Sequence, residues 1–194
     1  MKKDLVKNAI FSLVLSSIAI VIYVSFRFKF NYAISGIIAL MHDVLFTILF
    51  FGIFKIEINS VFIAAILTII GYSINDTIVT FDMIRENYKK KKEIKNKEDL
   101  DEIVDASIKR VFFRTILTTI TTLVPVICLM IMGAREIFGF NIALLVGFIF
   151  GVLSSIFVSN YLWRTLEYRR LITPKKEDDD DDELNEYQIK GINC

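Results

Sequence analysis

Residues 60–81 read SVFIAAILTIIGYSINDTIVTF, an apolar run interrupted toward its end by Asn75 and Asp76. A helix of about twenty residues, rising 1.5 Å per residue, spans the roughly 30 Å hydrocarbon core of a bilayer. The strands of a membrane barrel would instead alternate polar and apolar residues over about ten positions, and this run does not. The stretch therefore predicts a transmembrane helix with an ionisable side chain inside it.

Similar apolar runs lie on both sides of this stretch. They cover residues 9–26, 33–54, 111–132 and 137–163. Hydrophobic residues make up 54% of the 194-residue chain, more than a soluble domain of this length contains. No small-residue cleavage site follows the first run, so it is interpreted as a span rather than a signal peptide. The sequence thus predicts an all-α, polytopic transmembrane helix bundle of about five spans over residues 9–163.

The distribution of basic residues predicts the topology, because cytoplasmic loops are enriched in Lys and Arg. Such residues concentrate in residues 82–110, which predicts a cytoplasmic loop. Within residues 85–107, Ile94, Leu100, Ile103 and Val104 recur at near-helical spacing, which predicts an interfacial or loop helix. The segment is either a solvated orienting loop or a docking surface for a partner. Residues 164–194, with an acidic run at 178–183, predict a charged and disordered cytoplasmic tail.

The amino terminus departs from this pattern. Five spans and a cytoplasmic carboxyl terminus place residues 1–8 outside as a short stub, although Lys2, Lys3 and Lys7 favour the inside. We therefore expect this chain to be part of a larger unit, with a further span and an external domain upstream that are lost or separately encoded.

Several polar side chains lie within the predicted spans, where an ionisable group costs roughly 2.5 to 3.5 kcal/mol on insertion scales. His42 and Asp43 lie near the middle of the second span, Asp76 lies in the third, and Arg114 lies in the fourth. For His42 and Asp43, a hydrogen bond between helices and a functional role both remain open.

Two polar stripes accompany Asp76 and Arg114. Ser73, Thr77 and Thr80 share the helical face of Asp76, and Arg114 begins a stripe that comprises Thr115, Thr118, Thr119 and Thr122. Hydroxyls and charges facing lipid would be unsatisfied, so the stripes are expected to face each other or one wet crevice. Asp76 and Arg114 then form either a structural ion pair or a proton relay, in which Asp76 carries the proton because Arg does not release one.

The remaining motifs are less specific. Gly147 and Gly151 form a GxxxG pattern that predicts close helix packing. Cys128 and Cys194 have neither disulfide nor metal-ligand spacing. His42 is the only histidine, and no catalytic cluster accompanies it, so neither an enzyme nor a cofactor or metal is predicted.

The polar region of the third span also matches a known pattern. The stretch GYSINDTIV at 71–79, followed by Phe81-Asp82 and IREN at 84–87, resembles the hallmark of the SecF family of bacterial protein-export membrane proteins. The segments ALMHDV at 39–44, AAILT at 64–68 and Arg114-Thr115 match further family segments in order. The resemblance covers about residues 9–163.

This resemblance implies a fold, a function and partners. The fold is half of a pseudo-symmetric membrane domain like that of resistance-nodulation-division transporters, and a complete member has six spans with an external domain between the first two. The function is that of an auxiliary Sec translocase subunit in the bacterial cytoplasmic membrane, driven by the proton motive force. Implied partners are a SecD-like subunit, the SecYEG translocon with other accessory membrane subunits, the unfolded exported polypeptide and membrane lipid, but no nucleic acid.

The resemblance also implies a proton pathway of Asp76, Arg114, Asn75 and Thr118. Two positions depart from the family pattern: Met83 stands where a second Arg is usual, and Lys109-Arg110 replaces a typical Gln-Thr. Arg110 lies one helical turn from Arg114, so which of the two reaches Asp76 remains open. The alternative function is one half of an exporter of lipids or small molecules on the same architecture.

Overall fold

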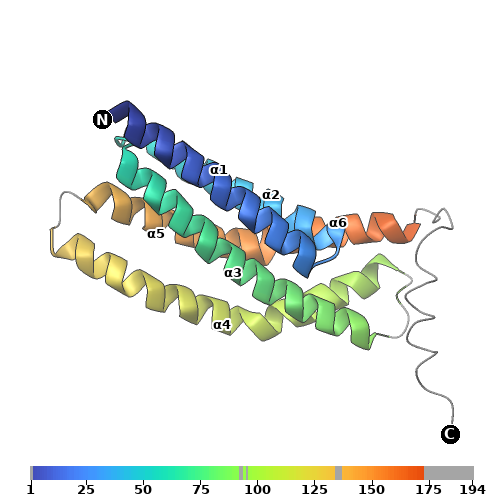
Figure 1. The fold of residues 1–194 in the computed structure, drawn as a ribbon. Helices are drawn as coiled ribbons and strands as arrows, with labels where there is room; N and C mark the ends of the chain where they lie inside the picture. The colour runs from blue at the N-terminus through green and yellow to red at the C-terminus, as the bar shows by residue number, and fades with distance from the viewer. Residues whose placement is uncertain (1, 92–93, 95, 134–136, 173–194) are drawn as a thin grey trace, which may run out of the picture.

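The computed structural model describes the backbone of residues 2–91, 94, 96–133 and 137–172. The regular structure of these described residues is a series of helices (Figure 1): α1 (Lys2–Arg27), α2 (Phe30–Ile53), α3 (Ser60–Lys90), α4 (Lys97–Ile131), α5 (Phe138–Leu153), the π-helical turn η2 (Ser154–Val158) and α6 (Ser159–Ile172). The predicted all-α bundle is confirmed.

Four helical segments are long and apolar enough to cross a membrane. They are Phe30–Ile53, Val61–Lys90, Lys97–Ile131 and Phe138–Ile172. In α1 the described apolar part is shorter, at Val14–Arg27, and the predicted stub at 1–8 is helical from Lys2 onward. The chain is therefore built as a multi-pass membrane protein.

The predicted cytoplasmic loop at 82–110 is mostly helical. α3 continues to Lys90, and α4 begins at Lys97. Residues 82–90 contain no Gly or Pro that would end a helix, and Lys90 Nζ pairs with Glu86 Oε1 at 2.6 Å, one turn apart. At the start of α4 the Asp99 carboxylate accepts a hydrogen bond from the Asn96 N–H at 3.1 Å.

The beginning of the predicted tail at 164–194 is helical as well, because α6 extends to Ile172. Glu167, in this part of α6, is buried and accepts a hydrogen bond of 2.6 Å from Asn31 Nδ2 at the start of α2. This contact anchors the end of α6 to the bundle. The acidic run at 178–183 and Cys194 lie outside the described residues.

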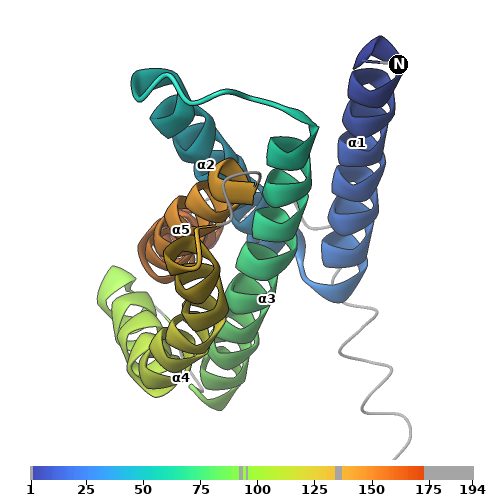
Figure 2. The same cartoon turned by 90° about the vertical axis from the view of Figure 1, so that its left-hand side faces the viewer.

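α5 occupies the middle of the bundle and packs against α2, α3 and α4, whereas α1 lies at the edge beside α3 (Figure 2). A Cβ added at Gly147 would lie 2.3 Å from Ile69 Cδ1, so only glycine lets α5 approach α3 this closely. The close packing predicted from the GxxxG pattern is confirmed at this position. α5 continues through the π-helical turn into α6.

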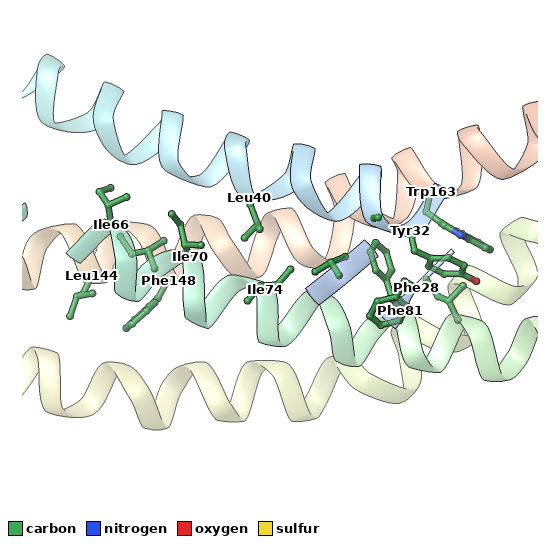
Figure 3. Packing of buried hydrophobic residues seen from close by; sticks show 14 of the residues in the cluster. Phe28, Tyr32, Leu40, Ile66, Ile70, Ile74, Phe81, Leu144, Phe148 and Trp163 are labelled. Atoms are coloured by element: carbon green, nitrogen blue, oxygen red, sulfur yellow. The ribbon is translucent and has the colours of Figure 1, made fainter. Parts of the chain in front are cut away.

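The buried core extends along α3 and includes an apolar group toward each end (Figure 3). At one end Ile66 and Ile70 lie near Leu144 and Phe148; at the other an aromatic cluster comprises Phe28, Tyr32, Phe81 and Trp163. The Tyr32 ring centroid is 5.0 Å from that of Trp163 and 5.3 Å from that of Phe81. These rings join α2, α3 and α6, and Phe81 lies closer to the carboxyl end of α3 than Asp76.

Candidate functional site

Asp76 lies on α3 with only 5% of its surface exposed. Its Oδ2 atom is buried and has no hydrogen-bond partner among the described residues. The backbone carbonyl of Asp76 accepts a hydrogen bond from Thr80 Oγ1 at 3.0 Å, so the helix itself satisfies the Thr80 hydroxyl. A buried carboxylate oxygen without a donor is costly, which marks Asp76 as a candidate functional group rather than a structural one.

Arg114 is the charged residue that acts electrostatically on Asp76. No ion pair joins the two within the described part of the chain, so Arg114 acts on Asp76 across the α3–α4 interface without a salt bridge. Arg110, the other candidate, has its Nη1 atom 3.5 Å from Glu86 Oε1. Arg114 is therefore the arginine whose charge acts on Asp76, and its part in a proton pathway stays a prediction.

Arg114 is exposed and lines a pocket of about 300 Å³ between α3 and α4. The other lining residues are Val79, Asp82, Met83, Glu86, Arg110 and Val111. Met83, the position that departs from the family pattern, thus borders the space in front of Arg114. Asp82 is held toward α1 by Arg27, whose Nη2 atom lies 3.0 Å from Asp82 Oδ1.

The two supporting residues of the predicted pathway are less closely tied to Asp76. Asn75 and Thr118 are both exposed. Thr118 Oγ1 donates to the carbonyl of Arg114 at 3.0 Å and lies 2.9 Å from that of Thr115. Arg114 and Thr118 therefore share one face of α4, while no contact brings Asn75 to them among the described residues.

The side-chain contact between α3 and the α4 stripe is made by a tyrosine that is not part of the α3 stripe and that sequence reasoning did not single out. On α4, Thr115 and Thr119 are buried. Tyr72 of α3 places its hydroxyl 3.5 Å from Thr119 Oγ1, and Thr122 Oγ1 lies 3.3 Å from the same hydroxyl. The α3 stripe itself is divided, because Ser73 and Thr77 face α2 instead of α4.

A second polar cluster forms around Asp43 of α2, which is 1% exposed. Ser73 Oγ donates a hydrogen bond of 2.5 Å to Asp43 Oδ2, and His42 Nδ1 lies 3.3 Å from Asp43 Oδ1. Ser154 of the π-helical turn lies near the same carboxylate, and its hydroxyl donates to the Gly151 carbonyl at 3.1 Å. This is the interhelical hydrogen bond that was one of the two interpretations of His42 and Asp43.

The buried polar residues that sequence reasoning missed include one on α5 and one on α6. Asn141 of α5 is 1% exposed, and neither of its side-chain polar atoms has a partner among the described residues. Glu167 was assigned to the tail on charge alone, although Tyr88 donates to its Oε1 at 3.2 Å. Spacing relative to Asn160 and Trp163 on the same helix could have indicated that Glu167 belongs to a buried face.

Fold and site together define a class: a polytopic α-helical membrane protein with ionisable side chains inside its bundle. The family model described as "Protein export membrane protein SecD/SecF, C-terminal" matches residues 1–169. The chain belongs to this family.

Relatives and solved structures agree with this assignment. The chain is 47% identical over 169 residues to the protein translocase subunit SecDF of Bacillus subtilis, covering 87% of this chain and 23% of the relative. It is 46% identical over 173 residues to the subunit SecF of Sebaldella termitidis, covering 89% and 54%. A crystal structure of SecDF in its super-membrane-facing form superposes with a TM-score of 0.79 at 35% identity, covering 88% and 23%. The chain thus spans about half the length of the SecF relative and a quarter of SecDF.

Proposed function

We propose that this chain acts within an auxiliary subunit of the Sec protein translocase, in the bacterial cytoplasmic membrane, and uses the proton motive force to assist protein export. The relatives' names, SecF and SecDF translocase subunits, support this role over that of a lipid or small-molecule exporter. The observation that carries the mechanism is the buried and unpartnered Oδ2 of Asp76 on a helix facing Arg114.

In this mechanism Asp76 takes up and releases the proton, and Arg114 is a fixed positive charge that acts on it across the interface. Because the two side chains are not paired, a small shift of α4 relative to α3 changes their electrostatic interaction without breaking a contact. One proton crossing the membrane supplies roughly 2.3 kcal/mol per 100 mV, enough to shift a two-state equilibrium more than tenfold.

The proposed partner is a SecD-like subunit packed against α4, within an assembly that includes the SecYEG translocon and the exported chain. α4 supports this proposal, because only 17% of its apolar 18-residue stretch is buried inside the bundle, against 61% for the corresponding stretch of Phe138–Ile172. Arg114 and Thr118 are exposed on this helix, and polar groups at membrane depth need protein or water beside them. In the proposed topology the α3–α4 connection and α6 face the cytoplasm.

The test is gradient-dependent export in vesicles that contain the chain reassembled with its partners. Asp76→Asn keeps the size of the side chain and removes its titratable charge, so stimulation of export by the proton gradient should be lost while assembly is retained. Thr68→Val is the matched control, since Thr68 lies on the same helix, is exposed, and donates only to the Ala64 carbonyl at 2.9 Å. Normal gradient stimulation in the Asp76→Asn vesicles would refute the proton role.

A further inference from the structure

A second pocket, of about 490 Å³, lies at the end of the bundle where α2 begins and where α3 and α6 end. Its lining is strongly basic: Lys29, Tyr32, Arg85, Tyr88, Lys89, Glu167 and Arg170. Three helices contribute to it, so the cations converge only in the folded bundle. The protein-export role proposed above assigns no task to this pocket.

The one carboxylate among the lining residues, that of Glu167, already interacts with neighbouring side chains. Glu167 is 4% exposed; its Oε2 accepts from Asn31 at 2.6 Å, and its Oε1 accepts from Tyr88 at 3.2 Å and lies 3.4 Å from Arg170 Nη1. These contacts hold Tyr88 and Arg170 in position.

The other three cations lack an anionic partner. Across the described ranges, Lys29, Arg85 and Lys89 have no carboxylate oxygen within ion-pair distance. Cations that converge on a concave site raise the local positive potential and attract an anion. Arg and Lys donors suit phosphate oxygens, the Arg fork by bidentate contact and Lys as a point charge.

Apolar surface adjoins the basic pocket. Phe30, the residue after Lys29, is 76% exposed, and Ile172, two residues beyond Arg170, is 58% exposed. A partly exposed tyrosine such as Tyr88 is typical of the membrane–water interface, where lipid headgroups lie. A ligand with an anionic head and acyl chains would satisfy both parts of this surface, whereas a free anion would use only the pocket.

We propose that this pocket binds the phosphate of an anionic glycerophospholipid, with the acyl chains lying against the apolar surface beside it. Basic pockets between transmembrane helices are suited to such headgroups. The inference is independent of the proton role of Asp76, because it rests on different helix ends and different residues.

The test uses the full chain purified in a neutral detergent. Phosphatidylglycerol, phosphatidylcholine and glycerol phosphate are titrated separately, and binding is followed by native mass spectrometry and by the fluorescence of Trp163. Trp163 is the only tryptophan; its ring lies 5.0 Å from that of Tyr32 and 6.1 Å from that of Tyr88, so it reports on the pocket walls. We expect phosphatidylglycerol to bind more tightly than phosphatidylcholine.

The test variant carries both Arg85→Gln and Lys89→Gln. This double variant should weaken phosphatidylglycerol binding by roughly tenfold to thirtyfold, the effect of removing two cations near an anionic lipid. Lys90→Gln is the matched control, because Lys90 is adjacent on α3 but pairs with Glu86 outside the pocket, and it should leave binding unchanged. Arg85→Lys keeps the charge, preserves the fold and should retain most of the binding.

The outcomes separate the possibilities. Binding that is equal for phosphatidylglycerol and phosphatidylcholine, or equal in the double variant and the Lys90→Gln control, overturns the proposal. Binding of glycerol phosphate as tight as that of phosphatidylglycerol overturns the lipid assignment and identifies a soluble phosphate ester as the ligand. The proposal is supported if the double variant loses binding while its lipid-free Trp163 spectrum and its melting temperature match those of the parent chain.

Discussion

Two buried aspartates on neighbouring helices of this bundle have opposite surroundings. Asp43 has a partner for each carboxylate oxygen, Ser73 at 2.5 Å and His42 at 3.3 Å. Asp76 has a buried oxygen with no partner among the described residues, and Arg114 acts on it without pairing. A saturated carboxylate fastens helices together, whereas an unsaturated one is free to change its protonation and its neighbours. On this comparison we propose a structural role for Asp43 and a functional one for Asp76.

The largest expected difference is in stability when either side chain is truncated. Asp43→Ala removes the acceptor of the Ser73 hydroxyl inside the bundle and should destabilise the chain by about 1–3 kcal/mol, the cost of leaving a buried donor unsatisfied. Asp76→Ala removes an unsatisfied group and should change stability little. Thermal unfolding in detergent measures both, and an equal loss in the two variants would remove the distinction between the aspartates.

A glycine substitution tests the close packing of α3 against α5 beside the two aspartates. Gly147→Ala brings a Cβ within 2.3 Å of Ile69 Cδ1, so α3 and α5 must separate or Ile69 must turn, at a cost of about 1 kcal/mol. Gly71→Ala is the control, because nothing lies within 4 Å of a Cβ at that position. Unfolding midpoints for the two should differ; similar midpoints would show that the α3–α5 contact yields easily.

A smaller effect is expected from the arginines near Asp76. Arg114→Lys keeps the charge but not the planar fork, and it should lower gradient-dependent export several-fold while leaving the amount of assembled protein unchanged. Arg110→Lys should export normally, because Arg110 faces Glu86. Vesicle export with immunoblot controls makes the comparison, and the reverse ranking would identify Arg110 as the residue that acts on Asp76.

The smallest effect concerns charges outside the membrane spans. Lys91 Nζ lies 2.7 Å from both Asp99 Oδ1 and Glu102 Oε2, and these carboxylates hold the pKa of Lys91 above its ordinary value. The stabilisation is therefore complete below the ordinary Lys pKa and is lost as the pH rises through the raised one.

Lys91→Gln should slightly speed amide hydrogen exchange in the first turns of α4 near neutral pH, because exposed ion pairs contribute little. At a pH above the raised pKa the variant and the parent chain should exchange alike. A difference that persists at high pH would mean that the Lys91 stem, and not its charge, supports the helix start.

The predictable part of the fold was the number and the kind of helices, since bilayer thickness sets a length that an apolar run either meets or does not. The extents of α3 and α4 were not predictable in the same way. Residues 82–110 were predicted to be a cytoplasmic loop with a helix inside it, whereas α3 itself continues to Lys90 and α4 begins at Lys97. A solvated helix has the same composition as a charged loop, and local pairs such as Glu86 with Lys90 support the helix. Glu167 was misplaced for the same reason: its charge suggested solvent, whereas Asn31 and Tyr88 supply the partners that allow its burial.

The sequence by itself determined an all-α membrane bundle, membership of the SecD/SecF family, and the identity of the ionisable residues within the spans, because hydropathy and motif spacing are properties of the chain alone. Only the tertiary structure shows that each carboxylate oxygen of Asp43 has a partner while Oδ2 of Asp76 has none among the described residues, that Arg114 acts electrostatically on Asp76, and that four cations from three helix ends converge on one pocket. The physical reason is that hydrogen bonding and electrostatic interaction depend on distances of a few ångströms between helices, and helical periodicity specifies the face of a residue but not the neighbour opposite it.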